Sequence, residues 1–509
     1  MPTAHQKILT PENLAFKAEK LRQEGKRIVL CHGTFDLLHI GHIRHLQSAS
    51  KEGDVLIATI TGDIYVNKGP GRPVFNEHLR SENLAALACV DFISINQAST
   101  AINVISKVKP QVYVKGKDYK KASDDVTGNI TREKEEVKKY GGKVIFTEDI
   151  TFSSSNLLND NFGIFSPETQ SFLKQIRKKH KDIEIIRLLK NLSQLKVAVA
   201  GDAIIDEYYY TTLLGQSGKG IHPSVKYESK ELFAGGALAV ANHLAGFVNS
   251  VTLVTGLGTG DNYEDFILSK LNNNITPHFY YFDKAPTVVK RRYVDGDLTK
   301  LFEVYIYDDQ ASLKENDHKI CAWLQNNAHS FDIVFVPDFG NGFVSQNMVR
   351  SLCDKSRFLA VNTQINSGNR GYHVINRYPR ADFISLNGAE LRLATHNRYD
   401  PLEELAEKVA KNLDAQYLAV TLGREGALLL DRKKNVTHSI PVLSTIVLDR
   451  VGAGDSFLSL AGLCLGAGLP SDIGLFIGSA AAALDVQIVC NREPISPVNL
   501  YKYITTLLK

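Results

Sequence analysis

The chain has few cysteines, and their positions argue against cysteine-based sites. Its 509 residues contain six, which lie far apart and include no CxxC pair. A zinc site or a disulfide framework needs closely spaced or paired cysteines, so we expect neither.

The chain also lacks a long apolar segment and a marked excess of charge. No apolar run approaches the roughly 20 residues that cross a bilayer, and the start, MPTAHQKILTPENLAFK, lacks the basic and then apolar pattern of a signal peptide. The net charge of +4 is nearly neutral, and charges of both signs are interspersed. We therefore expect a cytoplasmic protein with no nucleic-acid or membrane partner.

The length of the chain predicts more than one folding unit. A chain of 509 residues is too long for one ordinary hydrophobic core, and 44% hydrophobic with 22% charged residues is typical of globular domains. Short apolar runs alternate with helix-like stretches, as in RIVLCHG, DVLIATI, VDFISI, VYVKG and GGKVIFTED. Strands separated by helices indicate a parallel sheet, and we place this first α/β domain at residues 1–160.

A second α/β domain is predicted at residues 194–509. Its strands are expected at KVAVAGD, SVTLVTGLG, DIVFVPDFG, FLAVN, DFISLN, YLAVTLG and ALLLD, while YYYTTLL and YVDGDLTKLFEVYIY look like strands of a small lid. Residues 161–193 form the linker, where apolar residues recur at helical spacing after Ser166 and Pro167. We predict one connecting helix there.

The first motif with chemical meaning is CHGTFDLLHIGH, at residues 31–42. GTFD follows a strand and HIGH begins a helix, so backbone N–H groups and the positive helix end can face phosphates. His39 and His42 are three residues apart on one helical face, where their imidazoles can donate to phosphate oxygens. Gly33 and Gly41 allow a nucleotide to approach the backbone closely. The motif predicts nucleotidyl transfer with the two histidines as catalytic groups.

Residues 27 to about 158 resemble the cytidylyltransferase-like superfamily. The matching pieces are GTFDLLHIGH, GRPV, VKGKDY and FSSSNLL, and they look most like the adenylyltransferase half of the bifunctional heptose-phosphate kinase/adenylyltransferases. The resemblance implies a Rossmann-like fold and ATP or CTP as nucleotidyl donor. It implies nucleotide or phosphate contacts at Gly33, Thr34, Phe35, Asp36, Gly41, Lys51, Arg72, Arg80, Gly116, Asp118, Ser153 and Ser154. For Lys51 and Arg80, an ordinary surface position is the alternative.

The second motif is VGAGDSF, at residues 451–457. Transfer of a γ-phosphoryl group to an alcohol requires a base for the hydroxyl proton and donors for the transferred group. Gly452, Ala453 and Gly454 precede Asp455 and an apolar helix, so bare N–H groups lie at the helix start beside one carboxylate. Taken alone, the motif also fits a glycine-rich helix start with Asp as a cap.

Residues 194–509 resemble the ribokinase-like (PfkB) carbohydrate kinases. The matching pieces are AGDAIID, AGGALAVANHLA, VTLVTGLG, LNGAEL, VTLGREGA and DRVGAGDSF. The resemblance implies a ribokinase-like α/β fold with a small β lid, Asp455 as general base, ATP as phosphoryl donor and Mg²⁺ near Glu390. Implied ATP contacts are Asn387, Glu390, Thr421, Gly423, Gly426, Gly452, Ala453 and Gly454. Implied sugar contacts are Asp206, Gly235, Gly236, Lys290 and Arg291.

Two places depart from the heptose kinases that this half resembles. Ala239 stands where they carry Asn, and Asn362-Thr363-Gln364 stands where they read an Asp-Pro-Lys turn. The order of the two halves is also reversed. These differences predict either an acceptor other than heptose 7-phosphate or a kinase fold used for binding.

Together the two motifs predict a bifunctional enzyme. It would phosphorylate a sugar or polyol and then attach a nucleotide, which gives an NDP-sugar for surface glycan biosynthesis. The alternative keeps nucleotidyl transfer alone, with a silent kinase fold used for dimerisation or ligand sensing. A sensor that retains both folds without catalysis is the third interpretation. We expect a homo-oligomer, such as a dimer.

Overall fold

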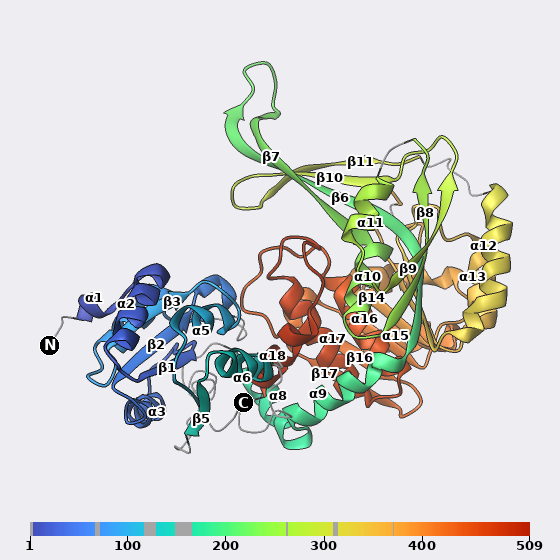
Figure 1. Ribbon diagram of the computed structural model, residues 1–509. Coiled ribbons are helices and arrows are strands. Elements are labelled where there is room, and N and C mark those ends of the chain that lie inside the picture. The colour runs from blue at the N-terminus through green and yellow to red at the C-terminus, as the bar shows by residue number, and fades with distance from the viewer. Residues whose placement is uncertain are drawn as a thin grey trace. The chain divides into compact units, whose positions relative to one another are not determined.

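The computed structural model describes residues 4–66, 72–116, 129–147, 165–260, 263–308, 314–369 and 371–508. The chain divides into two compact units, residues 1–177 with 501–509 and residues 178–500 (Figure 1). The domain limits at 160 and 194 stay predictions. Within the described residues, no helix has both the length and the apolar character of a membrane span.

Five parallel strands form the sheet of the first unit, in the order β3-β2-β1-β4-β5. They are β1 (Ile28–Gly33), β2 (Val55–Thr61), β3 (Phe92–Asn96), β4 (Val112–Gly116) and β5 (Lys143–Thr147). All five coincide with the apolar runs in the sequence, so the predicted α/β fold of this unit is confirmed.

Helices cover both faces of this sheet because successive residues of each strand point to opposite sides. Val29 and Cys31 of β1 pack towards α3 (Ile40–Ser50) and α4 (Glu77–Ala85). Ile28 and Leu30 pack on the other side, towards the remaining helices. Those are α2 (Pro11–Gln23), α5 (Ile102–Val108) and α6 (Asn129–Lys139), and the short α1 (Ala4–Lys7) precedes them.

The core sheet of the second unit is built around β6 (Lys196–Gln216). The first part of β6 pairs in parallel with β8 and β12, and the sheet continues through β13, β14, β15, β16 and β17. The bounds are β8 (Ser250–Gly258), β9 (Ile275–Phe282), β12 (Ile333–Asp338), β13 (Leu359–Thr363), β14 (Phe383–Asn387), β15 (Tyr417–Thr421), β16 (Ala427–Asp431) and β17 (Val436–Ile440). The seven predicted core strands are present, which confirms the predicted α/β class of this unit.

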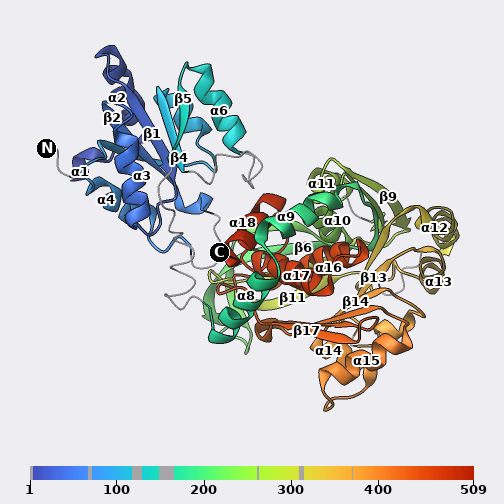
Figure 2. The same ribbon diagram turned by 90° about the horizontal axis from the view of Figure 1, so that it is seen from below.

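Two groups of helices enclose this sheet (Figure 2). On one side lie α9 (Asp182–Asn191), α10 (Ala237–Ala245), α16 (Ala453–Gly466) and α17 (Ser471–Asp485). The opposite face packs against α12 (Lys314–Asn327), α13 (Gln346–Lys355), α14 (Gly388–Thr395) and α15 (Leu402–Asn412). The remaining helices are α11 (Glu264–Lys270) and α18 (Pro497–Leu507), and only the start of α18 belongs to this unit. Gly462 of α16 lies against Phe335 and Phe383 of the sheet, where an added Cβ would come within 2.6 Å of the Phe335 ring. Small residues therefore let α16 approach the strands closely.

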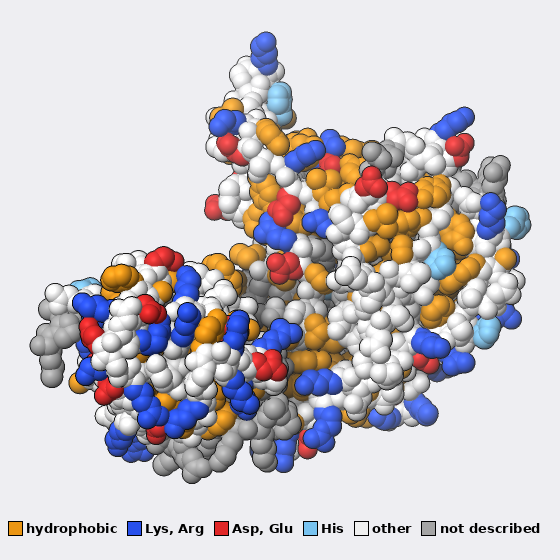
Figure 3. Space-filling model, viewed as in Figure 1, with side chains coloured by type: hydrophobic (Ala, Val, Ile, Leu, Met, Phe, Trp, Pro, Cys, Tyr) orange, Lys and Arg blue, Asp and Glu red, His pale blue; other side chains and the backbone are white. Residues whose placement is uncertain are grey.

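The second half of β6 leaves the core sheet and becomes part of the lid. There it pairs with β7 (Pro223–Gly236) and β10 (Val288–Val294), and β10 pairs with β11 (Lys300–Ile306). The lid predicted at residues 208–214 and 293–307 is thus present, although the polar strand β7 was not predicted. Phe302 and Val304 are exposed on it, and hydrophobic side chains gather over the lid strands (Figure 3).

The linker holds two helices instead of the one predicted, α8 (Pro167–Lys179) and α9. Lys181 between them has an extended backbone (φ −87°, ψ 143°), and Glu184 accepts its N–H at the start of the second helix. The His180 side chain contacts Asp472 at 3.1 Å. The apolar spacing continues across the break, which is why the sequence favoured a single helix.

We predict that a cut between residues 166 and 167 gives two fragments that each fold. The sheet of the first unit closes before residue 148, and α8 should stay with α18 because Arg177 donates to the Leu507 carbonyl at 3.1 Å. Fragments 1–166 and 167–509 should each show a cooperative thermal transition by circular dichroism. A fragment that is unfolded on its own would contradict this boundary.

Candidate active sites

The first candidate site lies where the strand order of the first unit reverses. The chain runs from β1 to β2 and β3 on one side and then crosses to β4 and β5 on the other. Ligands of open α/β sheets bind at the carboxyl edge of such a switch point. Gly33 and Gly116 end the two central strands, whose register pairs Cys31 with Val114. The structure therefore brings these two predicted residues to one edge.

His39 and His42 lie side by side at the start of α3. Their rings stack with centroids 4.0 Å apart, and Phe35 meets His42 edge-on at 5.5 Å. His39 caps the helix, since its Nδ1 accepts the Gly41 N–H at 3.1 Å. Burial lowers the pKa of His39, so the neutral ring carries its proton on Nε2. Nε2 has no hydrogen-bond partner among the described residues and is available as a donor.

The GTFD turn is held by its own carboxylate. Asp36 is buried, and its Oδ1 accepts the N–H groups of Val74 and Phe75 at 2.8 and 3.1 Å. Its charge also raises the pKa of Arg72, which burial lowers more strongly. Asp36 thus connects the turn to the GRPV segment, and Phe35 takes a left-handed conformation with φ 47°.

Arg80 lies inside the first unit and not at the surface, where a phosphate ligand would lie. It is completely buried, and its three nitrogens donate to the carbonyls of Phe75, Thr34 and Thr61 and to Asp63. This geometry makes Arg80 a support of the GTFD turn and does not favour direct contact with nucleotide. The charge and the helical position were visible in the sequence, but the three carbonyl partners were not.

Among the other predicted ligands of the first site, Lys51 is not brought to the histidines. Lys51 is exposed at the C-terminal end of α3, about 18 Å along the helix axis from His39 at 1.5 Å per residue. Thr34 is buried in the turn. Asp118, Ser153 and Ser154 lie outside the described residues.

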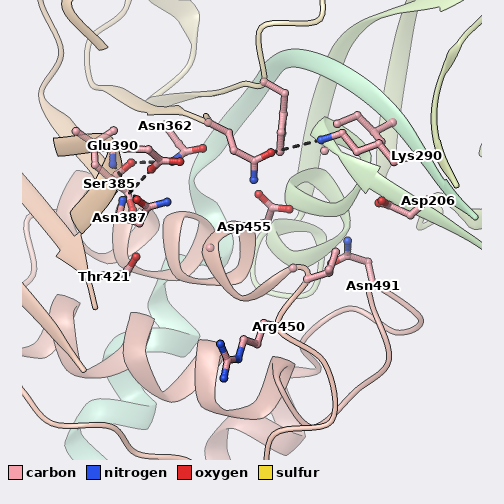
Figure 4. Close-up of a pocket in the computed structure, with 18 of the residues that line it drawn as sticks. Asp206, Lys290, Asn362, Ser385, Asn387, Glu390, Thr421, Arg450, Asp455 and Asn491 are labelled. Atoms are coloured by element: carbon pink, nitrogen blue, oxygen red, sulfur yellow. Dashed lines mark hydrogen bonds between the residues drawn. The ribbon is translucent and has the colours of Figure 1, made fainter. Parts of the chain in front are cut away.

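The second candidate site is a pocket of about 270 Å³ between the core strands, the start of α16 and the lid (Figure 4). Asp206, Gly236, Lys290, Asn387, Glu390, Thr421, Gly452, Gly454 and Asp455 all line it, as predicted for one site. Further lining residues are Ile204, Arg292, Phe339, Asn362, Gln364, Ser385, Leu386, Arg450, Val451 and Asn491. Residues from the whole length of the second unit therefore meet at one cavity.

Asp455 occupies the first turn of α16 behind a glycine turn. Burial, and next the charge of Asp206, raise the pKa of Asp455 to about 7, while Lys290 lowers it. Gly452 has φ 102°, and an added Cβ would lie 2.5 Å from Asn491 Oδ1. A side chain there would be strained and crowded. Gly454 has open space around it, so the backbone at the helix start faces the pocket directly.

Asp206 lies on the lid side of the pocket and is held in place by its neighbours. It forms an ion pair with Arg292, which also donates to Glu303 at 2.9 Å. An added Cβ on Gly235 would lie only 2.0 Å from Asp206 Oδ2, so this position needs glycine for the close approach of β7. The predicted sugar residues Asp206 and Gly236 line the pocket, whereas Gly235 is absent from its lining.

The strand register decides which basic residues of β10 face the pocket. Lys290 pairs with Asp206 on β6, and its Nζ lies 3.4 Å from Gln364 Oε1. Arg291 points to the opposite face, where it binds Glu207 at 2.6 Å. Lys290 and Arg292 therefore line the pocket and Arg291 does not, because neighbouring strand residues alternate.

Asn387 and Glu390 form a capping box at the start of α14. Asn387 Oδ1 accepts the Glu390 N–H at 2.9 Å, and Glu390 Oε2 accepts the Asn387 N–H at 2.8 Å. Glu390 Oε1 accepts the Ile365 N–H, and burial raises the pKa of Glu390 to about 7. Each carboxylate oxygen keeps a further lone pair, so Glu390 can still contribute to a Mg²⁺ shell of water and phosphate oxygens. Within the described parts of the chain, no group of three or more His, Cys, Asp or Glu side chains could hold a metal ion.

Four positions singled out in the sequence lie away from the pocket lining. Gly426 has φ 91°, and an added Cβ would meet the Ile440 carbonyl at 1.9 Å, so this glycine serves strand packing. Gly423 is exposed in a short turn, and Ala453 begins α16 without lining the pocket. Ala239 is buried in α10.

Five further polar or aromatic residues line the pocket without having been predicted from the sequence: Arg292, Phe339, Ser385, Arg450 and Asn491. Arg450 stands directly before VGAGDSF, and this adjacency was the signal that could have found it. The other four come from separate segments, namely β10, the end of β12, β14 and the turn after α17, and no local pattern records that these segments meet.

Comparisons with known families agree with both halves of this arrangement. Residues 194–495 match the pfkB family carbohydrate kinase model, and residues 30–160 match the Cytidylyltransferase-like model. The chain belongs to the pfkB family of carbohydrate kinases. It also carries a cytidylyltransferase-like domain, so both family predictions are confirmed.

Individual relatives match only part of the chain. The bifunctional protein HldE of Geotalea uraniireducens is 42% identical over 165 residues, 31% of each chain. HldE of Geobacter metallireducens is 39% identical over 168 residues, 32% of each chain. The chain thus spans less than a third of the length of these relatives. Among solved structures, phosphofructokinase-2 from Escherichia coli in complex with potassium has a TM-score of 0.51 and a sequence identity of 15%. The match covers 62% of this chain and 99% of the phosphofructokinase-2 chain. This likeness shows the fold alone.

We predict that Arg80→Met destabilises the first unit. The change leaves three carbonyls and Asp63 without their donors, and we expect a loss of about 3 kcal/mol in the free energy of unfolding. Urea unfolding of the chain measures it, with the exposed helix residue changed in Arg44→Met as the matched control. Unchanged stability with a raised KM for nucleotide would instead make Arg80 a nucleotide ligand.

Proposed function

We propose that the protein is a bifunctional enzyme that phosphorylates a sugar or polyol and transfers a nucleotidyl group to the resulting sugar phosphate. The products would be an NDP-sugar for surface glycan biosynthesis and pyrophosphate. The observation that carries the proposal is the pocket of the second unit, where Asp455 lies beside a glycine turn and opposite Lys290 and Asp206. A base, donors for a transferred phosphoryl group and polar partners for an acceptor are needed together for this reaction.

In the kinase step, the acceptor hydroxyl attacks the γ-phosphorus of ATP and ADP leaves. Asp455 takes the hydroxyl proton, and the N–H groups of the Gly452–Gly454 turn donate to the transferred phosphoryl oxygens. Asp206 orients the acceptor from the lid side, and Asn387, Glu390 and Thr421 hold the nucleotide end. Mg²⁺, when bound near Glu390, supplies charge neutralisation on the phosphates.

In the nucleotidyl step, an oxygen of the sugar phosphate attacks the α-phosphorus of ATP or CTP and pyrophosphate leaves. The Nε2–H of His39 is free to donate to an α-phosphate oxygen, because Nδ1 is used by Gly41. Stacked rings place the donor of His42 next to it. The start of α3 adds backbone N–H groups and a partial positive charge.

We predict that His39→Ala lowers pyrophosphate release about 100- to 1,000-fold, since removal of one preorganised donor has this effect. A pyrophosphate-release assay with a sugar phosphate and ATP or CTP measures the rate. The control is His78→Ala, an exposed histidine of the same unit. Wild-type turnover in folded His39→Ala protein would refute the role of the histidine pair.

We predict that the kinase rate rises about tenfold per pH unit up to a pH of about 7 and then levels off, because Asp455 acts only when ionised. Asp455→Asn should abolish this limb and lower sugar-dependent ADP formation about 100-fold or more, with ATP affinity little changed. Asp354→Asn, an exposed carboxylate of the same unit, is the control.

The acceptor panel should include sugars, polyols and their phosphates. A silent panel with wild-type protein would favour the alternative in which only nucleotidyl transfer remains and the kinase fold serves dimerisation or ligand sensing.

A further inference from the structure

The carboxylate of Asp449, shortly before the glycine turn of the second unit, accepts hydrogen bonds from donors in three parts of the fold. Asp449 is buried, and its Oδ1 accepts the N–H groups of Arg450 and Val451 at 2.8 and 3.2 Å. Lys300 Nζ lies 3.1 Å from the same oxygen. Oδ2 accepts the Tyr208 hydroxyl at 2.6 Å and the Cys490 N–H at 3.1 Å.

These donors link the lid to the reacting end of the pocket. Tyr208 lies on the lid half of β6, and Lys300 is the first residue of β11. Arg450 and Val451 lead directly into Gly452 and line the pocket, and Cys490 precedes the lining residue Asn491. A shift of either lid strand would therefore move the Asp449 side chain, and through it the backbone that leads into the glycine turn.

The charge balance makes this link dependent on Lys300. Burial tends to raise the pKa of Asp449, but the Tyr208 hydrogen bond and the Lys300 charge outweigh it and lower that pKa. Burial raises the pKa of nearby Asp485, and the charges of Asp455 and Asp449 raise it further. Lys300 thus offsets negative charge that would otherwise oppose an anionic phosphoryl group at the turn.

We propose that Asp449, held by Lys300 and Tyr208, is a positioning residue through which the lid sets the geometry of the Gly452–Asp455 turn. The proposal rests on the kinase function proposed above. An acceptor bound beneath the lid and a phosphoryl group at the turn then favour the same arrangement, so the two binding events are coupled.

The test is Lys300→Met, which removes the charge and keeps most of the aliphatic stem. We expect kcat for sugar-dependent ATP consumption to fall about 3- to 30-fold with an unchanged KM for ATP, because a positioning contact modulates coupling by such amounts. Lys300→Arg should restore most of the loss. Tyr208→Phe removes the second lid donor without changing charge and should act in the same direction. The control is Lys226→Met, which breaks an exposed lid ion pair with Glu228.

Hydrogen exchange of the full-length protein supplies a readout that needs no turnover. The amides of Arg450, Val451 and Cys490 should exchange faster in Lys300→Met than in wild type or Lys226→Met. If wild type turns over no acceptor, the proposed kinase function fails, and the exchange rates still decide the lid connection. Equal exchange at these three amides in all variants, or an unchanged kcat in an active enzyme, would overturn the positioning role.

Discussion

Strand β6 belongs to two sheets, and the second active site depends on this. Its first residues pair with β8 in the core, whereas Ile204–Tyr210 pair with β10 in the lid. Asp206 lies just past this transition, so one continuous backbone fixes its distance from both the core strands and Lys290. The approach is possible because β7 offers Gly235 opposite Asp206, where a Cβ would clash. A break in β6 would separate Asp206 and the lid strands from the core strands that line the same pocket.

In the proposed function both units must stabilise phosphate charge, and their candidate sites offer different electrostatics for it. The first unit offers a neutral, desolvated histidine and a helix start, so donors are present without a buried net charge. The second unit places three carboxylates, Asp206, Glu390 and Asp455, in one pocket with three basic residues, Lys290, Arg292 and Arg450. A proton must move in phosphoryl transfer to an alcohol, and a carboxylate with a pKa of about 7 suits that task.

The sequence predicted the elements better than the contacts between them. Every predicted strand is present because apolar runs and turn residues are local signals. Arg292 lines the pocket and the predicted Arg291 does not, because the facing side depends on register with β6, which no local pattern records. Arg80 resembled a surface ligand until its three carbonyl partners, from segments before it in the chain, were known. Gly426 looked like part of a nucleotide motif, but its requirement for glycine comes from the Ile440 carbonyl on the neighbouring strand.

The neutral side chain of Gln364 affects the pKa of Asp455. Arg292 forms an ion pair with Asp206. The positive charge of Lys290 interacts with both Asp206 and Asp455. Gln364 touches Lys290 through a neutral oxygen, so it does not cancel the lysine charge. That charge lowers the pKa of Asp455 against burial and the neighbouring carboxylates. A carboxylate in place of Gln364 would add a fourth negative group and raise that pKa further. The neutral side chain therefore helps to keep Asp455 ionisable near neutral pH, as the proposed role of Asp455 as base for a hydroxyl proton requires.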